Sequence, residues 1–113
     1  MISGVTELAV SVSVEDRDGD SRTVVRLVGE ADVTTRALAE VLGVEAAKKP
    51  HLLLVDISEL TFIDSAALNE ILQAHRKLRA DGGRLELAGP RRAVARILQL
   101  SAIDQIIPVR AST

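Results

Sequence analysis

The sequence contains no cysteine, tryptophan or tyrosine, and its only aromatic residue is Phe62. The absence of cysteine excludes a disulfide framework, a thiolate nucleophile and a cysteine zinc site. With so few aromatic side chains, the chain offers no stacking platform for single-stranded nucleic acid. No apolar run reaches the roughly eighteen residues of a membrane-spanning helix, so we expect no membrane contact. Residues 1–20 lack the features of a secretory signal, which favours a cytoplasmic protein.

The composition that remains is typical of one globular domain with an aliphatic core. The chain has 113 residues, of which 47% are apolar and 27% are charged, so residues 1–113 leave no room for a second domain. The net charge of −2 gives no general attraction to nucleic acid. The charge is unevenly distributed, however, because residues 1–64 carry −6 and residues 65–113 carry +4.

The N-terminal part of the chain has the pattern of a β-hairpin. Apolar residues alternate with small residues from Leu8 to Val14, which predicts a half-buried strand. A polar turn over residues 15–20 follows. The β-branched segment Thr23–Val28 predicts a second strand, which we expect to end at Gly29.

A helix and a buried strand are predicted next. Asp32, Thr34 or Thr35 could cap the helix, and Pro50 ends it. The continuous apolar run Leu52–Val55 is typical of a central strand with helices on both sides.

A loop containing Leu60 and Phe62 is expected after this strand, and either Asp64 or Ser65 then caps a second helix. The glycines of Asp81–Gly83 end that helix.

The C-terminal part continues the alternation of strands and helices. Arg84–Ala88 predicts a strand, Pro90 begins a third helix, and residues 103–109 predict a short helical turn and an edge strand that Pro108 confines to the edge. The order β-β-α-β-α-β-α indicates an α/β fold, with a small mixed sheet of four to five strands and helices packed against it.

Motifs for catalysis, metals and cofactors are missing. The sequence has no G-x-S-x-G elbow, P-loop or G-x-G-x-x-G motif. Its two histidines, His51 and His75, have no metal-ligand spacing, and we expect His51 at the surface and His75 partly exposed on a helix. We therefore expect no bound metal or cofactor.

Asp56, at the end of a buried strand, suggests a phosphate-accepting receiver domain. Such a site also needs acidic residues that bind Mg²⁺ and a lysine near the last strand. The only lysines are Lys48, Lys49 and Lys77, none of them in that strand. We interpret Asp56 instead as a turn or capping residue for the loop that follows it.

Most basic residues of the second half fall on the second and third helices and the strand between them. They are either solvated helix faces or a docking surface for an acidic partner. The residues are Arg76, Lys77, Arg79, Arg84, Arg91, Arg92 and Arg96.

Ser65 follows a predicted loop and stands at the start of a helix. Backbone N–H groups and the positive end of the helix dipole favour negative charge there. A phosphate on Ser65 would add roughly −1.5 to −2 charges without unfolding the domain. The pair Asp64 and Ser65 is therefore either a helix cap alone or a cap that also carries a switch.

Three segments together resemble the STAS domain of bacterial anti-sigma-factor antagonists. They are V-G-E-A-D-V (Val28–Val33), D-I-S-E-L-T-F-I-D-S-A-A-L (Asp56–Leu68) and G-G-R-L-E-L-A-G-P (Gly82–Pro90). The resemblance covers about residues 8–109, in the same order and spacing. It implies the STAS fold and a partner-switching protein rather than an enzyme.

The resemblance also implies which residues act. Ser65 matches the serine that an anti-sigma factor with serine-kinase activity phosphorylates. The unphosphorylated antagonist binds that anti-sigma factor and frees a sigma factor, and phosphorylation ends the complex. The partner-binding residues would be Asp32, Asp64, Ser65, Ala66, Ala67 and Leu68.

The chain departs from the family pattern D-S-[ST]-G-L-G. Ala66 stands for the second hydroxyl residue, and Ala67 and Asn69 stand for the glycines. STAS domains also serve as scaffolds and as accessory subunits of lipid transporters, and these roles remain the alternative. We expect a monomer or a weak homodimer.

Overall fold

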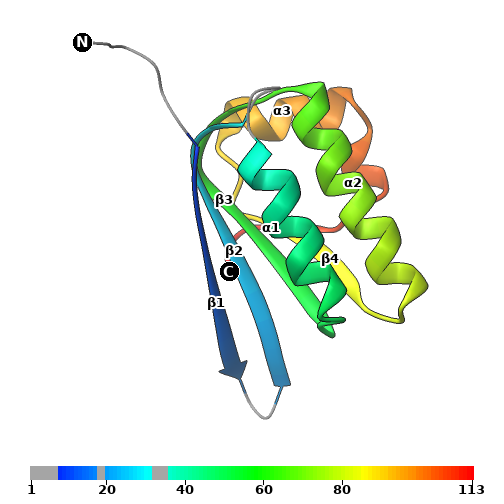
Figure 1. Cartoon of the computed structure of the whole chain (residues 1–113). Helices are drawn as coiled ribbons and strands as arrows, with labels where there is room; N and C mark the ends of the chain where they lie inside the picture. Colours follow the sequence, from blue (N-terminus) through cyan, green and yellow to red (C-terminus); the bar gives the residue numbers. More distant parts are fainter. Residues whose placement is uncertain (1–7, 18–19, 32–35) are drawn as a thin grey trace.

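The helices and strands follow one another in the order expected from the sequence (Figure 1). The computed structural model describes residues 8–17, 20–31 and 36–113. The elements are β1 (Ala9–Arg17), β2 (Asp20–Ala31), α1 (Arg36–Ala47), β3 (Leu52–Ile63), α2 (Ser65–Ala80), β4 (Arg84–Ala88), α3 (Arg92–Leu100), the 3₁₀ turn η1 (Ile103–Gln105) and β5 (Val109–Arg110). Among the residues described, no helix is both long enough and apolar enough to cross a membrane.

The strands described form one mixed sheet in the order β1-β2-β3-β4-β5. β1 pairs antiparallel with β2, and all the other pairs are parallel. This arrangement confirms the predicted mixed α/β fold. It also confirms an edge position for the last strand, which directly follows Pro108.

The N-terminal hairpin is longer than predicted. β1 continues through residues 15–17, which we had expected in the turn, and β2 begins at Asp20. Glu15 lies opposite Arg22 in the ladder, and the Arg22 Nη2 donates to Glu15 Oε1 at 2.8 Å. This cross-strand ion pair holds two polar residues in the sheet.

The prediction of a loop after Val55 is wrong, because β3 runs without a break from Leu52 to Ile63. Its partner β2 likewise does not end at Gly29. Instead, the register between the two strands shifts near Gly29, which adopts a φ of 109°. The Thr61 hydroxyl donates to the Gly29 carbonyl at 3.1 Å and spans this irregularity. Glycine here permits a bulge rather than a strand end.

Within the described residues, α1, α2 and α3 pack on one face of the sheet and none lies on the other, so the prediction of helices on both sides is wrong (Figure 1). Alternate residues of β3 belong to the same core cluster as the buried residues of the helices. These core residues include Leu53, Val55 and Ile57 of β3, Leu38 of α1, Ile71 of α2 and Val94 of α3. Leu54 points the other way and clusters with only Val24 and Ala88.

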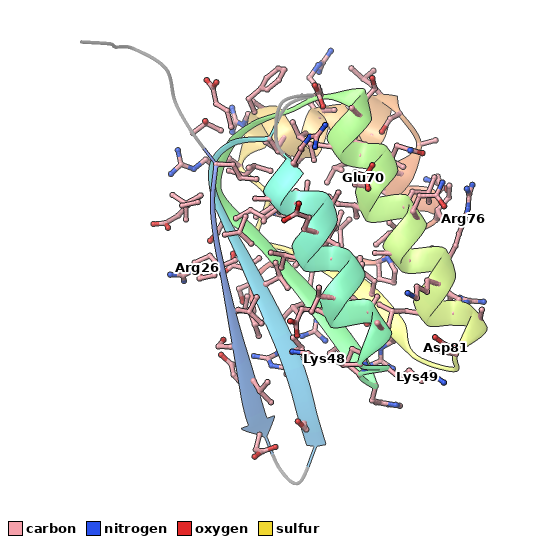
Figure 2. All side chains as sticks on the ribbon, in the orientation of Figure 1. Arg26, Lys48, Lys49, Glu70, Arg76 and Asp81 are labelled. Atoms are coloured by element: carbon pink, nitrogen blue, oxygen red, sulfur yellow. The ribbon has the colours of Figure 1, made fainter. Side chains whose placement is uncertain are left out.

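Ion pairs spread across the sheet face that no described helix covers. Arg26 lies beside Asp56, its register partner on β3, and points away from the helices in Figure 2. The Glu86 carboxylate forms two ion pairs, with Arg84 (Nε to Oε2, 2.8 Å) and with Arg110 (Nε to Oε1, 2.9 Å). The alkyl stems of such arginines cover apolar surface while their charged ends reach water. This explains how Leu54 is fully buried without a helix above it.

His75 is buried in α2 and not partly exposed as predicted, whereas His51 is exposed as expected. His75 retains only 7% of its accessible surface, and its Nδ1 has no hydrogen-bond partner within the described part of the chain. Burial, together with the nearby positive charges of Arg79 and Arg76, lowers the pKa of His75 below its ordinary value.

The predicted helix ends are largely confirmed. α2 ends at Ala80, and Gly82 beyond it has a φ of 83°, the conformation that favours glycine. α3 starts at Arg92, however, so Pro90 lies before the helix and not in its first turn. The caps expected for α1 lie outside the described residues.

Two glycines make a matched test of this packing. A Cβ on Gly83 would lie 2.5 Å from the Pro50 carbonyl oxygen, whereas one on Gly43, within α1, would meet nothing within 4 Å. Gly83→Ala should therefore destabilise the fold by about 1–3 kcal/mol. Gly43→Ala should stabilise it by about 0.5–1 kcal/mol, because alanine favours a helix. Urea unfolding measures both, and equal effects would contradict the packing described.

His75 should make stability depend on pH. Because its pKa is lowered by folding, the unfolded chain binds the proton at a higher pH than the folded chain does. The free energy of unfolding should therefore fall as the pH drops below about 6.5, the ordinary histidine value. His75→Leu should reduce this fall, whereas His51→Gln at the exposed histidine should not. An identical pH profile for wild type and His75→Leu would refute the assignment.

Candidate functional site

The start of α2 lies where β2 and β3 end together. β3 ends at Ile63, and the N–H of the next residue, Asp64, donates to the carbonyl of Ala31 at the end of β2 (3.0 Å). Ala31 and Ile63 are also register partners and are both buried. The start of α2 is therefore held in place at the carboxyl-terminal ends of β2 and β3.

Asp64 is the residue that caps α2, which decides between the two predicted candidates. Its backbone is extended, with φ −104° and ψ 178°, and its Oδ1 accepts from the Ala67 N–H at 2.9 Å. The Asp64 carbonyl accepts from the Leu68 N–H at 3.0 Å. The Ala67 N–H, which has no partner within the helix, is therefore satisfied by the Asp64 side chain.

Ser65 is the first residue of α2, and its side chain is exposed. It stands at the positive end of a sixteen-residue helix, beside a carboxylate that is already engaged in the cap. A negative group attached to its hydroxyl would face solvent and be favoured by the helix dipole. The position can therefore carry a charge change without disturbing buried packing.

The other expected contact residues divide into accessible and buried groups. Asp64 and Ala66 are half-buried, so a partner could reach them as well as Ser65. Ala67 and Leu68 are buried at 2% and 7% exposure and belong to the core cluster. Direct side-chain contact of these two with a partner does not fit this burial, and their role is to anchor the helix. Asp32 lies outside the described residues.

The exposure of Phe62 was missed by the sequence analysis. The side chain of this only aromatic residue is 43% exposed, three residues before Ser65. Its register partner on β2 is Glu30. Strand alternation would place Phe62 on the same face as the buried Leu60, and the extra residue Thr61 at the register shift breaks that alternation, so the sequence pattern gave no signal.

Asp56 is a structural residue on the open face of the sheet. Its Oδ1 accepts from the Ser58 N–H (3.0 Å) and hydroxyl (2.7 Å), and its Oδ2 accepts from Arg26 Nε (3.3 Å). Burial by itself would raise the pKa of Asp56, but these hydrogen bonds outweigh it and hold the pKa below its ordinary value.

Asp56 accepts from Ser58 two residues on, as a capping residue does, but the predicted loop is wrong, because β3 continues through this position and only its register with β2 shifts. With both oxygens occupied, this carboxylate is poorly placed to accept a phosphate.

The cap gives a direct test of how α2 starts. Asp64→Ala should lower the free energy of unfolding by about 1 kcal/mol, because the Ala67 N–H loses its acceptor. Asp64→Asn should retain most of the stability, since asparagine caps helices about equally well. Urea denaturation measures both, and equal losses in the two variants would argue against the capping hydrogen bond.

Comparison with known proteins indicates the family of this chain. The STAS domain family model matches residues 11–113. The anti-sigma-B factor antagonist of Listeria monocytogenes serovar 1/2a is 26% identical over 102 residues, which cover 89% of each chain.

Solved structures agree. The crystal structure of an anti-sigma factor antagonist from Mycobacterium paratuberculosis has a TM-score of 0.77 and 28% identity, over 92% of this chain and 87% of that one. The Bacillus cell fate determinant SpoIIAA in its phosphorylated form has the same fold, with a TM-score of 0.68 and 21% identity over 89% and 90%. Because the family model matches nearly the whole length, the protein belongs to the STAS domain family.

Proposed function

We propose that this protein is an anti-sigma factor antagonist that acts by partner switching. In the unphosphorylated form it binds an anti-sigma factor with serine-kinase activity and so frees a sigma factor. Phosphorylation of Ser65 by that kinase ends the complex. The relatives from Listeria and Mycobacterium, which are named as anti-sigma factor antagonists, support the general role.

The observation that carries the proposal is the position of Ser65. It is an exposed hydroxyl on the first residue of a capped helix, where a visiting kinase can reach it. Because Asp64 and not Ser65 forms the cap, the serine hydroxyl is not needed for the start of the helix. The fold can therefore tolerate modification of Ser65 while the surface changes.

The proposed switch is electrostatic. A phosphate adds roughly −1.5 to −2 charges at neutral pH to a surface that already holds the Asp64 carboxylate. A partner surface that fits the neutral hydroxyl must then desolvate a dianion or meet repulsion. Two residues close to the serine in sequence, the half-buried Ala66 and the exposed Phe62, are apolar and would suit the unphosphorylated contact.

The test begins with the modification itself. Incubation with ATP and the anti-sigma factor that co-purifies with the chain from its host should add one phosphate, which mass spectrometry should locate on Ser65. The Ser65→Ala chain should remain unmodified. Addition of an equal amount of phosphate to Ser65→Ala would contradict the assignment.

Binding to the same kinase then tests the switch. Ser65→Asp should weaken binding by at least about tenfold, because it places a permanent charge at the helix start. Ser65→Ala should bind like the unphosphorylated chain. Urea unfolding provides the control, since both variants should be as stable as the wild type. Equal affinity of Ser65→Asp and wild type, or co-purification with a permease instead of a kinase, would favour the scaffold or transporter role.

A further inference from the structure

The exposed face of α3 carries two arginines and a leucine in one row. Arg92, Arg96 and Leu100 are spaced four residues apart, so they lie along the same side of the helix. All three are exposed, whereas Val94 and Leu98 on the opposite side are buried in the core. The row is therefore a solvent-facing surface, which we call the α3 outer face.

The two arginines are placed where helix electrostatics disfavours them. Arg92 is in the first turn, at the positive end of the dipole, and that turn contains no acidic residue. Arg96 repels Arg92 because the two are four residues apart. The N-cap residue, Arg91, forms no side-chain capping bond. In α2, by contrast, Lys77 and Arg79 lie in the last turn, where cations are favoured.

Nothing within the described part of the chain compensates these charges. The ion pairs found there involve Arg22, Arg26, Lys48, Arg84 and Arg110, and no described carboxylate lies within 4.0 Å of Arg92 or Arg96. Residues that oppose helix electrostatics without a compensating contact inside the protein are expected at functional surfaces. The missing counter-charge would therefore come from a ligand.

Exposed apolar side chains accompany the arginines. Leu100 is 75% exposed, and Ile106, which follows the adjoining turn η1, is 48% exposed. Arginine combined with apolar anchors is characteristic of protein interfaces. A domain with a net charge of −2 and a single aromatic residue is poorly suited to nucleic acid. These features indicate an acidic protein surface as the ligand.

The α3 outer face is at the same end of the molecule as Ser65. α2 and α3 follow the neighbouring parallel strands β3 and β4, and Figure 1 shows α3 at the end where α2 begins. Arg91 Nε donates to the Ser58 carbonyl at 3.0 Å, which ties the start of α3 to β3. One partner of ordinary size could therefore contact both regions.

We propose that the α3 outer face is a second docking surface for the anti-sigma factor, binding an acidic segment that also accepts Leu100. This proposal rests on the proposed function. Ser65 provides the switch, and Arg92 and Arg96 provide attraction that depends on salt and is independent of the phosphate.

Charge reversal tests the surface against the co-purifying anti-sigma factor. The double variant Arg92→Glu with Arg96→Glu should raise the Kd at low salt at least tenfold and reduce its salt dependence. It should not unfold the helix, because glutamate at position 92 is favoured in a first turn and glutamate at position 96 is a good helix former. The matched control, Arg76→Glu with Arg79→Glu, reverses two exposed arginines of α2 and should change the Kd less than threefold. Leu100→Ser should weaken binding without changing its salt dependence.

The outcomes separate the two proposals. If the α3 variant binds like wild type while Ser65→Asp does not bind, the α3 proposal is overturned and the proposed function stands. If Ser65→Asp binds like wild type while the α3 variant does not, the switch fails and the docking surface stands.

A test with a generic acidic probe does not depend on the kinase. Poly-L-glutamate added to the isotopically labelled chain should shift the amide NMR signals of Arg92, Arg96 and Leu100 more than those of Arg76 and Arg79. Equal shifts on both helices would overturn the proposal. So would tighter binding to duplex DNA or to phosphatidylserine vesicles than to poly-L-glutamate, because the surface would then serve another class of ligand.

Discussion

The hydrogen bond from the Ala67 N–H to the Asp64 carboxylate determines where α2 begins, and the candidate site depends on that position. Asp64 is itself held by the Ala31 carbonyl at the end of β2. With the cap one residue before Ser65, the serine becomes the first helical residue and faces solvent, while Ala67 and Leu68 turn into the core. A shift of the cap by one residue would rotate the helix faces by about 100° and exchange these environments.

This arrangement separates the residues that stabilise the fold from those that the proposed switch would use. The buried side of α2 packs on the helix-covered face of the sheet, and its energy comes from aliphatic contacts that a surface charge barely affects. The exposed side presents Ser65 at the start of α2, and α3 lies at the same end of the molecule (Figure 1). Helices that follow neighbouring parallel strands begin at the same end of the sheet, so one partner could contact the starts of both α2 and α3. The opposite face of the sheet is covered by ion pairs formed within the chain.

Features set by local pattern could be predicted from the sequence. Strand alternation, helical stripes and the glycine after α2 depend only on residues that are close in sequence. The order of elements and the mixed sheet predicted from them are confirmed. The cap was narrowed to Asp64 or Ser65, because both residue types suit that position.

Features set by tertiary packing could not be predicted. Gly29 looks like a strand end and Asp56 looks like the start of a loop, because the pairing of β2 with β3, with its register shifts, is invisible in one segment. The burial of His75, by contrast, follows from helical spacing, because it lies four residues after Ile71 and three before Leu78; the polar identity of histidine concealed this. The central claim is that a charge on Ser65 changes the surface and leaves the fold intact. Amide NMR spectra of the chain with phosphoserine incorporated at position 65 test it most directly. Signal changes confined to the start of α2 and its immediate neighbours are predicted, and changes spread through the core strands would contradict it.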